Sequence, residues 1–246
     1  MATISEALAL ATQYYRANRV VRAEQLYRKV LTVAPQEPEA LCGLGAIAQQ
    51  AGKYDSASTL FGAAVRVRPE SVKAWFGLGN AHQGRSRFAD ATAAYERAIA
   101  LAPNLVAAYN NLGYALEQQG EWERAIATYR KALELQPDSL EVEVSLANAL
   151  YARQELPPER QERYGIANAE LGQACQKAGN ITGAIAYYQQ AIALNPTLAP
   201  AYYQLGEALN ARGRFAEALE CYQQALELDG DNTELADWVT IYQSLL

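Results

Sequence analysis

Side chains that could do chemistry are few and scattered in this sequence. Its 246 residues include one histidine, His82, and three cysteines, Cys42, Cys175 and Cys221. A metal site or a nucleophile–base pair needs such side chains in clusters, and the cysteines show no CxxC spacing. We therefore expect His82 to be a packed helix residue. The cysteines are expected to be small apolar residues, buried or half-buried in a reducing compartment.

Motifs that hold phosphates or activate nucleophiles do not occur either. The sequence has no P-loop, no GxGxxG after a strand pattern and no GxSxG elbow. Neighbouring carboxylates such as Glu121 and Glu123 fall at predicted helix starts, where negative charge suits the helix dipole. The sequence predicts a protein that is not an enzyme and has no cofactor and no metal site.

The charge distribution differs between the two parts of the chain. The net charge is −6, but residues 1–139 hold 15 Lys and Arg against 13 Asp and Glu, whereas residues 140–246 hold 6 against 14. An acidic C-terminal part argues against general nucleic-acid binding, because phosphates would be repelled. The alternative is that these charges only solvate helix faces.

No stretch of the sequence approaches the roughly 20 consecutive apolar residues of a membrane helix. Residues 1–17 do not resemble a signal peptide, because Glu6, Thr12 and Gln13 interrupt their apolar residues and no basic segment precedes them. We therefore expect a soluble, cytoplasmic protein without membrane insertion.

Four prolines, Pro35, Pro69, Pro103 and Pro137, are spaced 34 residues apart. Small and apolar residues recur in the same order between them, which is the signature of a repeat architecture. The order is shown most completely by Trp75, Leu78, Gly79, His82, Ala91, Tyr95, Ala98 and Pro103. The same order indicates six repeats, at residues 4–37, 38–71, 72–105, 106–139, 165–198 and 199–232.

Each repeat is predicted to contain two helices, because its apolar residues recur three and four positions apart. Glycine or asparagine, which tolerate a left-handed backbone, stands between the helices at Asn18, Gly52, Gly120, Gly179 and Gly213. Ser86 occupies this position in the third repeat, where we expect Gly84 to relieve the turn. Glycine within a helix costs about 1 kcal/mol relative to alanine, so Gly79 and Gly113 indicate close helix contacts.

This pattern resembles the tetratricopeptide-repeat family over roughly 200 residues. The resemblance implies an all-α fold, a right-handed α-solenoid of 34-residue helix-turn-helix repeats, here interrupted after the fourth repeat. In this family the first helix of each repeat lines a concave groove that holds a peptide or a partner helix. The function of one member does not follow from the fold alone.

The domain organisation predicted from the repeats has four parts. Residues 1–139 contain four repeats, residues 140–164 are an insert outside the pattern, residues 165–232 contain two repeats, and residues 233–246 form a C-terminal capping helix. Within the insert, residues 140–152 either cap the first four repeats or begin a distorted repeat through which the stack continues. The segment Leu156-Pro157-Pro158 replaces an expected second helix, so we favour a break or bend at a Pro-Pro hinge.

The candidate binding site lies on the first helices of the third and fourth repeats. Helical phase places a set of polar and aromatic side chains toward the groove, where we expect them to face solvent and to converge. Asn and Gln can donate to and accept from a peptide backbone, and aromatic rings supply apolar contact area. The predicted groove residues are Lys73, Phe76, Asn80, Gln83, Asn110, Asn111, Tyr114 and Glu117.

One subset of the family binds the C-terminal carboxylate of heat-shock chaperones through two asparagines and several cations. The matching positions here are Phe76, Asn80, Asn111, Glu141 and Ser145, so the asparagines match but every cation is missing. A carboxylate would be desolvated there with little compensation. We do not expect that kind of co-chaperone.

The sequence predicts a protein–protein interaction scaffold or assembly factor that binds a partner peptide or helix in the groove. One alternative is an RNA-binding solenoid that uses arginines of the first four repeats, although these form no continuous basic stripe. The other is a regulatory or self-associating subunit of a larger complex, with homo-oligomers forming through the acidic C-terminal lobe.

Overall fold

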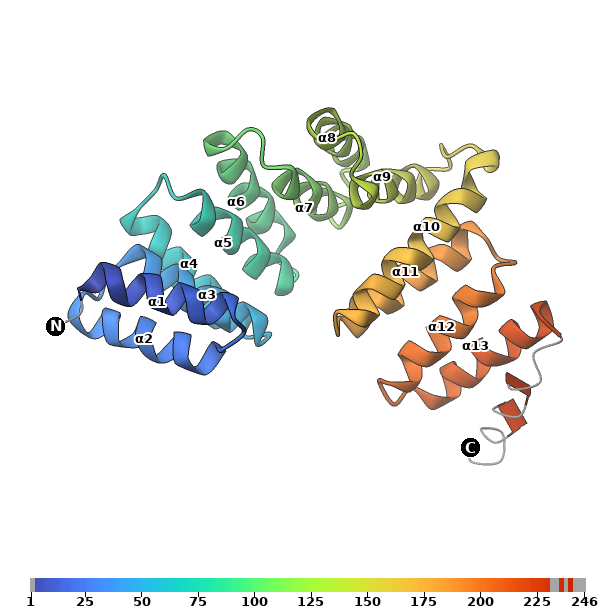
Figure 1. Cartoon of the computed structure of the whole chain (residues 1–246). Helices are drawn as coiled ribbons and strands as arrows, with labels where there is room; N and C mark the ends of the chain where they lie inside the picture. Colours follow the sequence, from blue (N-terminus) through green and yellow to red (C-terminus); the bar gives the residue numbers. More distant parts are fainter. Residues whose placement is uncertain (1–2, 231–234, 237–238, 241–246) are drawn as a thin grey trace. The chain divides into compact units, whose positions relative to one another are not determined.

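The computed structural model describes residues 3–230, 235–236 and 239–240, and every regular element within them is helical (Figure 1). Thirteen helices follow one another along this part of the chain. Their bounds are α1 Ile4–Arg16, α2 Val20–Val33, α3 Pro38–Gln50, α4 Tyr54–Val67, α5 Val72–Gly84, α6 Phe88–Leu101, α7 Val106–Glu117, α8 Trp122–Leu135, α9 Leu140–Ala152, α10 Pro158–Lys177, α11 Ile181–Leu194, α12 Ala199–Asn210 and α13 Phe215–Leu228.

The chain separates into two compact lobes, Met1–Asp138 and Ser139–Leu246. In the first lobe α1 to α8 pack as four helix pairs, and the second helix of each pair also contacts the first helix of the next. In the second lobe α10 packs on α11 and α12 packs on α13. The predicted all-α solenoid of paired helices is confirmed.

Glycines in the first helices make room for aromatic rings of the second helices. A Cβ atom on Gly79 would lie 2.4 Å from the Tyr95 ring, and one on Gly113 would lie 2.4 Å from the Tyr129 ring. Both rings are almost completely buried, with 0% and 1% of their residue surface exposed. The helix-propensity cost of each glycine is therefore offset by the burial of a large aromatic side chain.

The turn of the third repeat differs from the expectation. Ser86 itself adopts the left-handed backbone, with a φ of 56°, in the same way as Asn18 with a φ of 55°. Gly84 does not relieve this turn, because it is the last residue of α5 and a Cβ there would lie 2.4 Å from the Tyr54 ring. Gly84 is needed for packing against the preceding repeat.

The two prolines of the insert begin a helix, where the sequence pattern had indicated a hinge in place of one. Pro157 is the N-cap of α10 and Pro158 is its first residue. Proline suits this position because its missing N–H would have no partner in the first turn. The preceding Leu156 is buried, with 6% of its surface exposed. The connection between α9 and α10 is therefore short and anchored in the core.

Helix α9 contributes to the core of the second lobe. Val144 and Ala147 of α9 are buried in one cluster with Tyr164 of α10 and Leu194 of α11. Leu194 is 3% exposed, whereas Leu228, its equivalent in the next repeat, is 42% exposed. The packing of α9 explains why the equivalent leucines differ.

The predicted capping helix at residues 233–246 falls mostly outside the described residues. Two of its described residues, Leu235 and Val239, are buried against the core formed by α11, α12 and α13. The capping role of this segment stays a prediction.

Candidate functional site

The predicted groove residues all lie on two neighbouring helices of the first lobe. Lys73, Phe76, Asn80 and Gln83 belong to α5, and Asn110, Asn111, Tyr114 and Glu117 belong to α7. The first helices of successive repeats contact one another, α1 with α3, α3 with α5 and α5 with α7. They form one continuous face, which we call the first-helix face.

Three of the predicted amide side chains are brought together by the buried hydroxyl of Tyr95. Tyr95 Oη lies 2.7 Å from Asn80 Oδ1 and 2.9 Å from Gln83 Oε1, so its single proton is shared between the two oxygens. Asn111 Nδ2 donates to the same Asn80 Oδ1 at 2.9 Å. This network joins α5 to both α6 and α7, and it links the third repeat to the fourth.

The network sets the orientation of the amides. Asn80 Oδ1 accepts from two donors, so the Asn80 NH₂ group and the Asn111 carbonyl oxygen take no part in these bonds, and both residues are half-buried. Burial raises the pKa of Tyr95, in part offset by its hydrogen bond with Asn111, so the hydroxyl stays protonated and can donate at all physiological pH values. Each of these two amides is therefore held at one end by the network, and a donor group of Asn80 and an acceptor group of Asn111 lie outside it.

The two aromatic residues of the predicted groove differ in how freely they face solvent. The Phe76 ring is half-buried and packs on Tyr95 with ring centroids 5.9 Å apart. Tyr114 is 41% exposed, and its ring packs edge-on with the Phe88 ring, with ring centroids 6.2 Å apart. Phe76, Asn80, Gln83 and Asn111 are half-buried, and each packs on or bonds to its own scaffold, so their role as groove contacts stays a prediction.

Lys73 is not part of the amide network and lies toward the preceding repeats. It lines a hollow of about 320 Å³ together with Thr12, Pro38, Glu39, Cys42, Arg68 and Ser71. The predicted convergence of Lys73 with the amides stays a prediction. Asn110 is half-buried on α7 beside Asn111.

Glu117 carries a carboxyl group whose pKa is raised to about 7 by burial, although its hydrogen bond with Tyr129 lowers the pKa in part. Among the described residues, its oxygen Oε1 is buried and has no hydrogen-bond partner. Glu117 is thus close to half-protonated near neutral pH. It can act as either a donor or an acceptor on the first-helix face.

The remaining candidates for chemistry stay isolated. His82 is half-buried, and burial lowers its pKa, so the imidazole is neutral at pH 7. All three cysteines are free thiols. In the part of the chain that the structure describes, no group of three His, Cys, Asp or Glu could hold a metal ion. No helix among the described residues is long and apolar enough to cross a membrane.

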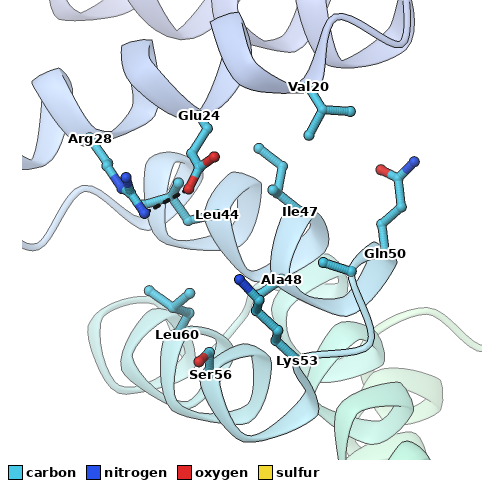
Figure 2. Close-up of a pocket in the computed structure, with 11 residues that line it drawn as sticks. Val20, Glu24, Arg28, Leu44, Ile47, Ala48, Gln50, Lys53, Ser56 and Leu60 are labelled. Carbon is cyan, nitrogen blue, oxygen red and sulfur yellow. Dashed lines mark ion pairs between the residues drawn. The ribbon is translucent and has the colours of Figure 1, made fainter.

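A second hollow lies between α2, α3 and α4 and was not expected from the sequence (Figure 2). It measures about 560 Å³. The hollow is lined by the apolar residues Leu44, Ile47 and Leu60 and by Lys53. It is also lined by the ion pair of Arg28 Nη2 with Glu24 Oε1, which are 2.6 Å apart. The hollow is formed with the second helices α2 and α4 and shares no residue with the groove that was predicted.

Sequence reasoning missed that tyrosine hydroxyls organise the first-helix face, although a signal was available. Tyr27 bonds to Thr12, Tyr188 to Gln176 and Tyr222 to Glu207, so the arrangement recurs beyond the third repeat. The residue fifteen positions before Tyr95 is Asn80, which is polar. The residue fifteen positions before Phe61, which has no hydroxyl, is Ala46. At this offset Tyr27, Tyr95 and Tyr222 bond to polar side chains, whereas Tyr188 bonds to Gln176, twelve residues before it.

Comparison with known proteins assigns the family. A tetratricopeptide-repeat family model matches residues 8–57, 43–104 and 78–139, and two further models of this repeat match residues 199–232 and 172–211. The first model alone spans more than half of the chain. The chain therefore belongs to the tetratricopeptide-repeat family, whose members generally mediate protein–protein interaction or complex assembly and are typically not enzymes.

Solved structures with the same fold include PilF of Pseudomonas aeruginosa, with a TM-score of 0.58 and 16% sequence identity over 96% of each chain. A structure of MamA (AMB-1) has a TM-score of 0.54 and 20% identity, covering 62% of this chain and 83% of that one. No curated protein matches the chain. At these identities the likeness concerns the fold alone.

Proposed function

We propose that this protein is an interaction scaffold or assembly factor that binds a peptide or helix of a partner protein along the first-helix face of the first lobe. The proposed contact residues are Lys73, Phe76, Asn80, Gln83, Asn110, Asn111, Tyr114 and Glu117. The observation that carries the proposal is the fixed amide pair of Asn80 and Asn111, held by the Tyr95 hydroxyl.

A donor group of Asn80 and an acceptor group of Asn111 match the C=O and N–H groups of a peptide backbone. Because the amides are already oriented, binding loses little side-chain entropy at these positions. Tyr114, which is 41% exposed, adds apolar area one turn beyond Asn110 on the same helix. These contacts orient a segment without demanding a particular sequence, as expected for a scaffold.

Quantitative affinity capture from native lysate tests the proposal with two variants matched in exposure. Tyr114→Ala removes an aromatic side chain from the face, and Phe215→Ala removes one that is 49% exposed at the start of α13. A partner should be retained by the parent and by Phe215→Ala and reduced about 30-fold or more by Tyr114→Ala, as for a loss of roughly 2 kcal/mol at an anchor residue.

If both variants retain the captured protein equally well, its binding site lies elsewhere on the chain. Capture of nucleic acid that is released by moderate salt would favour the RNA-binding alternative. A concentration-dependent increase in mass that Tyr114→Ala leaves unchanged, with no other protein captured, would favour the self-associating alternative.

A further inference from the structure

We propose that the first-helix face continues over α1, α3 and α5 as a basic groove that binds an acidic segment of a partner protein, an inference that rests on the proposed function. We define the basic groove by its three cations, Arg16, Arg68 and Lys73. It consists of two hollows of about 320 Å³ and 410 Å³ that share Thr12 and Glu39 among their lining residues, so they adjoin.

The cations of the basic groove outnumber its carboxylates. Arg68 Nη1 lies 3.8 Å from Glu39 Oε1, with both side chains largely exposed, and such a pair contributes little to stability. Among the described residues, no carboxylate lies within ion-pair distance of Arg16 or Lys73. The groove therefore carries a net charge of about +2 in a chain whose net charge is −6.

Hydroxyl groups accompany the cations. Thr12 and Ser71 line the first hollow, and Ser5 lines the second. Hydroxyls and ammonium or guanidinium groups together satisfy the oxygens of a carboxylate. Leu8 and Cys42 are only 7% and 2% exposed, although other apolar atoms, such as those of the exposed Ala9, also line the second hollow. The lining therefore supplies both the positive charge and the hydroxyl donors that a carboxylate needs.

Glu39 distinguishes an acidic peptide from a nucleic acid. It lines both hollows and so lies where they meet, between the side of Arg16 and the side of Lys73. A nucleic-acid strand carries a phosphate at every nucleotide and would place one against Glu39. A peptide can carry its carboxylates on either side and a neutral residue opposite Glu39. The arrangement favours a segment with spaced Asp or Glu.

The test uses the full chain and fluorescence anisotropy. The probe is a fluorescein-labelled peptide of about 12 residues of Glu, Ala and Leu, long enough to span about 40 Å when extended. A matched peptide has Gln in place of every Glu. We expect the Glu peptide to bind about tenfold more tightly at low salt, and this difference to shrink as salt shortens the screening length.

Two lysines give a matched pair of charge reversals. Lys73→Glu changes the basic groove, whereas Lys53→Glu makes the same change at the separate hollow between α2, α3 and α4 (Figure 2). Both lysines are exposed. Lys73→Glu should weaken binding of the Glu peptide about tenfold, and Lys53→Glu should change it less than about twofold.

Three results would overturn the proposal: equal binding of the Glu and Gln peptides, equal effects of the two lysine variants, or tighter binding of a fluorescein-labelled oligothymidine of the same length. Competition separates this inference from the proposed function. A captured partner that loses binding with Tyr114→Ala but not with Lys73→Glu would keep the first-helix face as the binding site, without Lys73 as a contact, and would refute the acidic ligand. Conversely, Glu-peptide binding that no captured protein displaces would support an acidic ligand and contradict the proposed partner site.

Discussion

The side-chain amides of Asn148 and Asn168 exchange two hydrogen bonds, each 3.1 Å long, between α9 and α10. Asn168 has no exposed surface, and its Nδ2 also donates to the Tyr164 carbonyl oxygen at 2.8 Å. A buried amide is costly unless its groups are paired. The pair therefore makes α9 part of the second lobe through polar contacts as well as through the apolar cluster.

Asn148→Ala should destabilise α9 and α10, because it leaves the buried Asn168 amide without its partner. We expect a loss of about 1–3 kcal/mol in unfolding free energy. Hydrogen exchange of the α10 amides measures it locally. Gln173→Ala, an exposed change on the same helix, is the control and should leave exchange within about 0.5 kcal/mol of the parent. Equal exchange in both variants would mean that the amide pair contributes nothing.

The start of the second lobe can be tested by truncation. A fragment of residues 139–246 keeps α9 and the apolar cluster around Val144, Tyr164 and Leu194. A fragment of residues 165–246 loses α9 and the first two turns of α10, and it exposes Leu194. We expect a cooperative thermal transition from the longer fragment and a poorly folded or self-associating shorter one. Cooperative unfolding of a monomeric shorter fragment would contradict this.

Two glycines should respond to alanine in opposite directions. At Gly79 a Cβ would lie 2.4 Å from the buried Tyr95 ring, so Gly79→Ala should cost about 1–3 kcal/mol through overpacking. Gly62 lies within α4, and the nearest atom to its Cβ position is Arg66 Nη1 at 3.8 Å. Gly62→Ala should stabilise by up to about 1 kcal/mol through helix propensity. Thermal unfolding of both variants compares them directly.

The repeats and the helix pairs could be predicted from the sequence because local residues mark many of the helix ends. Ser71 caps α5 with its side chain, and Phe88 begins α6 two residues after the left-handed Ser86. Such signals act within a few residues, so they do not depend on the rest of the fold.

Other features could not be predicted because local sequence is ambiguous there. Pro158 is equally consistent with a helix stop and with a first helical residue, and only the burial of Leu156 distinguishes the two. Helical phase identified Asn80 and Asn111 as groove residues. Their shared bonding with Tyr95 depends on contacts between repeats, which periodicity does not encode.

Removing the Tyr95 hydroxyl should uncouple the amide network. Tyr95→Phe leaves Asn80 Oδ1 and Gln83 Oε1 without their buried donor, and we expect a loss of about 1–2 kcal/mol. Tyr109→Phe is the matched control, because that hydroxyl donates to the Pro103 carbonyl oxygen at an exposed position, at 3.1 Å. Urea unfolding of the two variants should separate them. A network without energetic value would give equal midpoints.

Glu117 should make the first lobe more stable as the pH falls. Its pKa is raised from 4.5 to about 7 in the folded protein because burial disfavours the carboxylate. The folded state therefore binds more protons than the unfolded state between these values, and stability from this group falls as the pH rises through this range. The largest effect is about 3 kcal/mol between pH 4 and pH 8.

Glu117→Gln keeps a neutral side chain of the same shape, so it should match the parent near pH 5 and exceed its stability at pH 8. Urea unfolding at both pH values checks this, with Glu70→Gln, an exposed change, as the control. If Glu117→Gln and the parent differ by the same amount at both pH values, the pKa of Glu117 is not raised into this range in the folded protein.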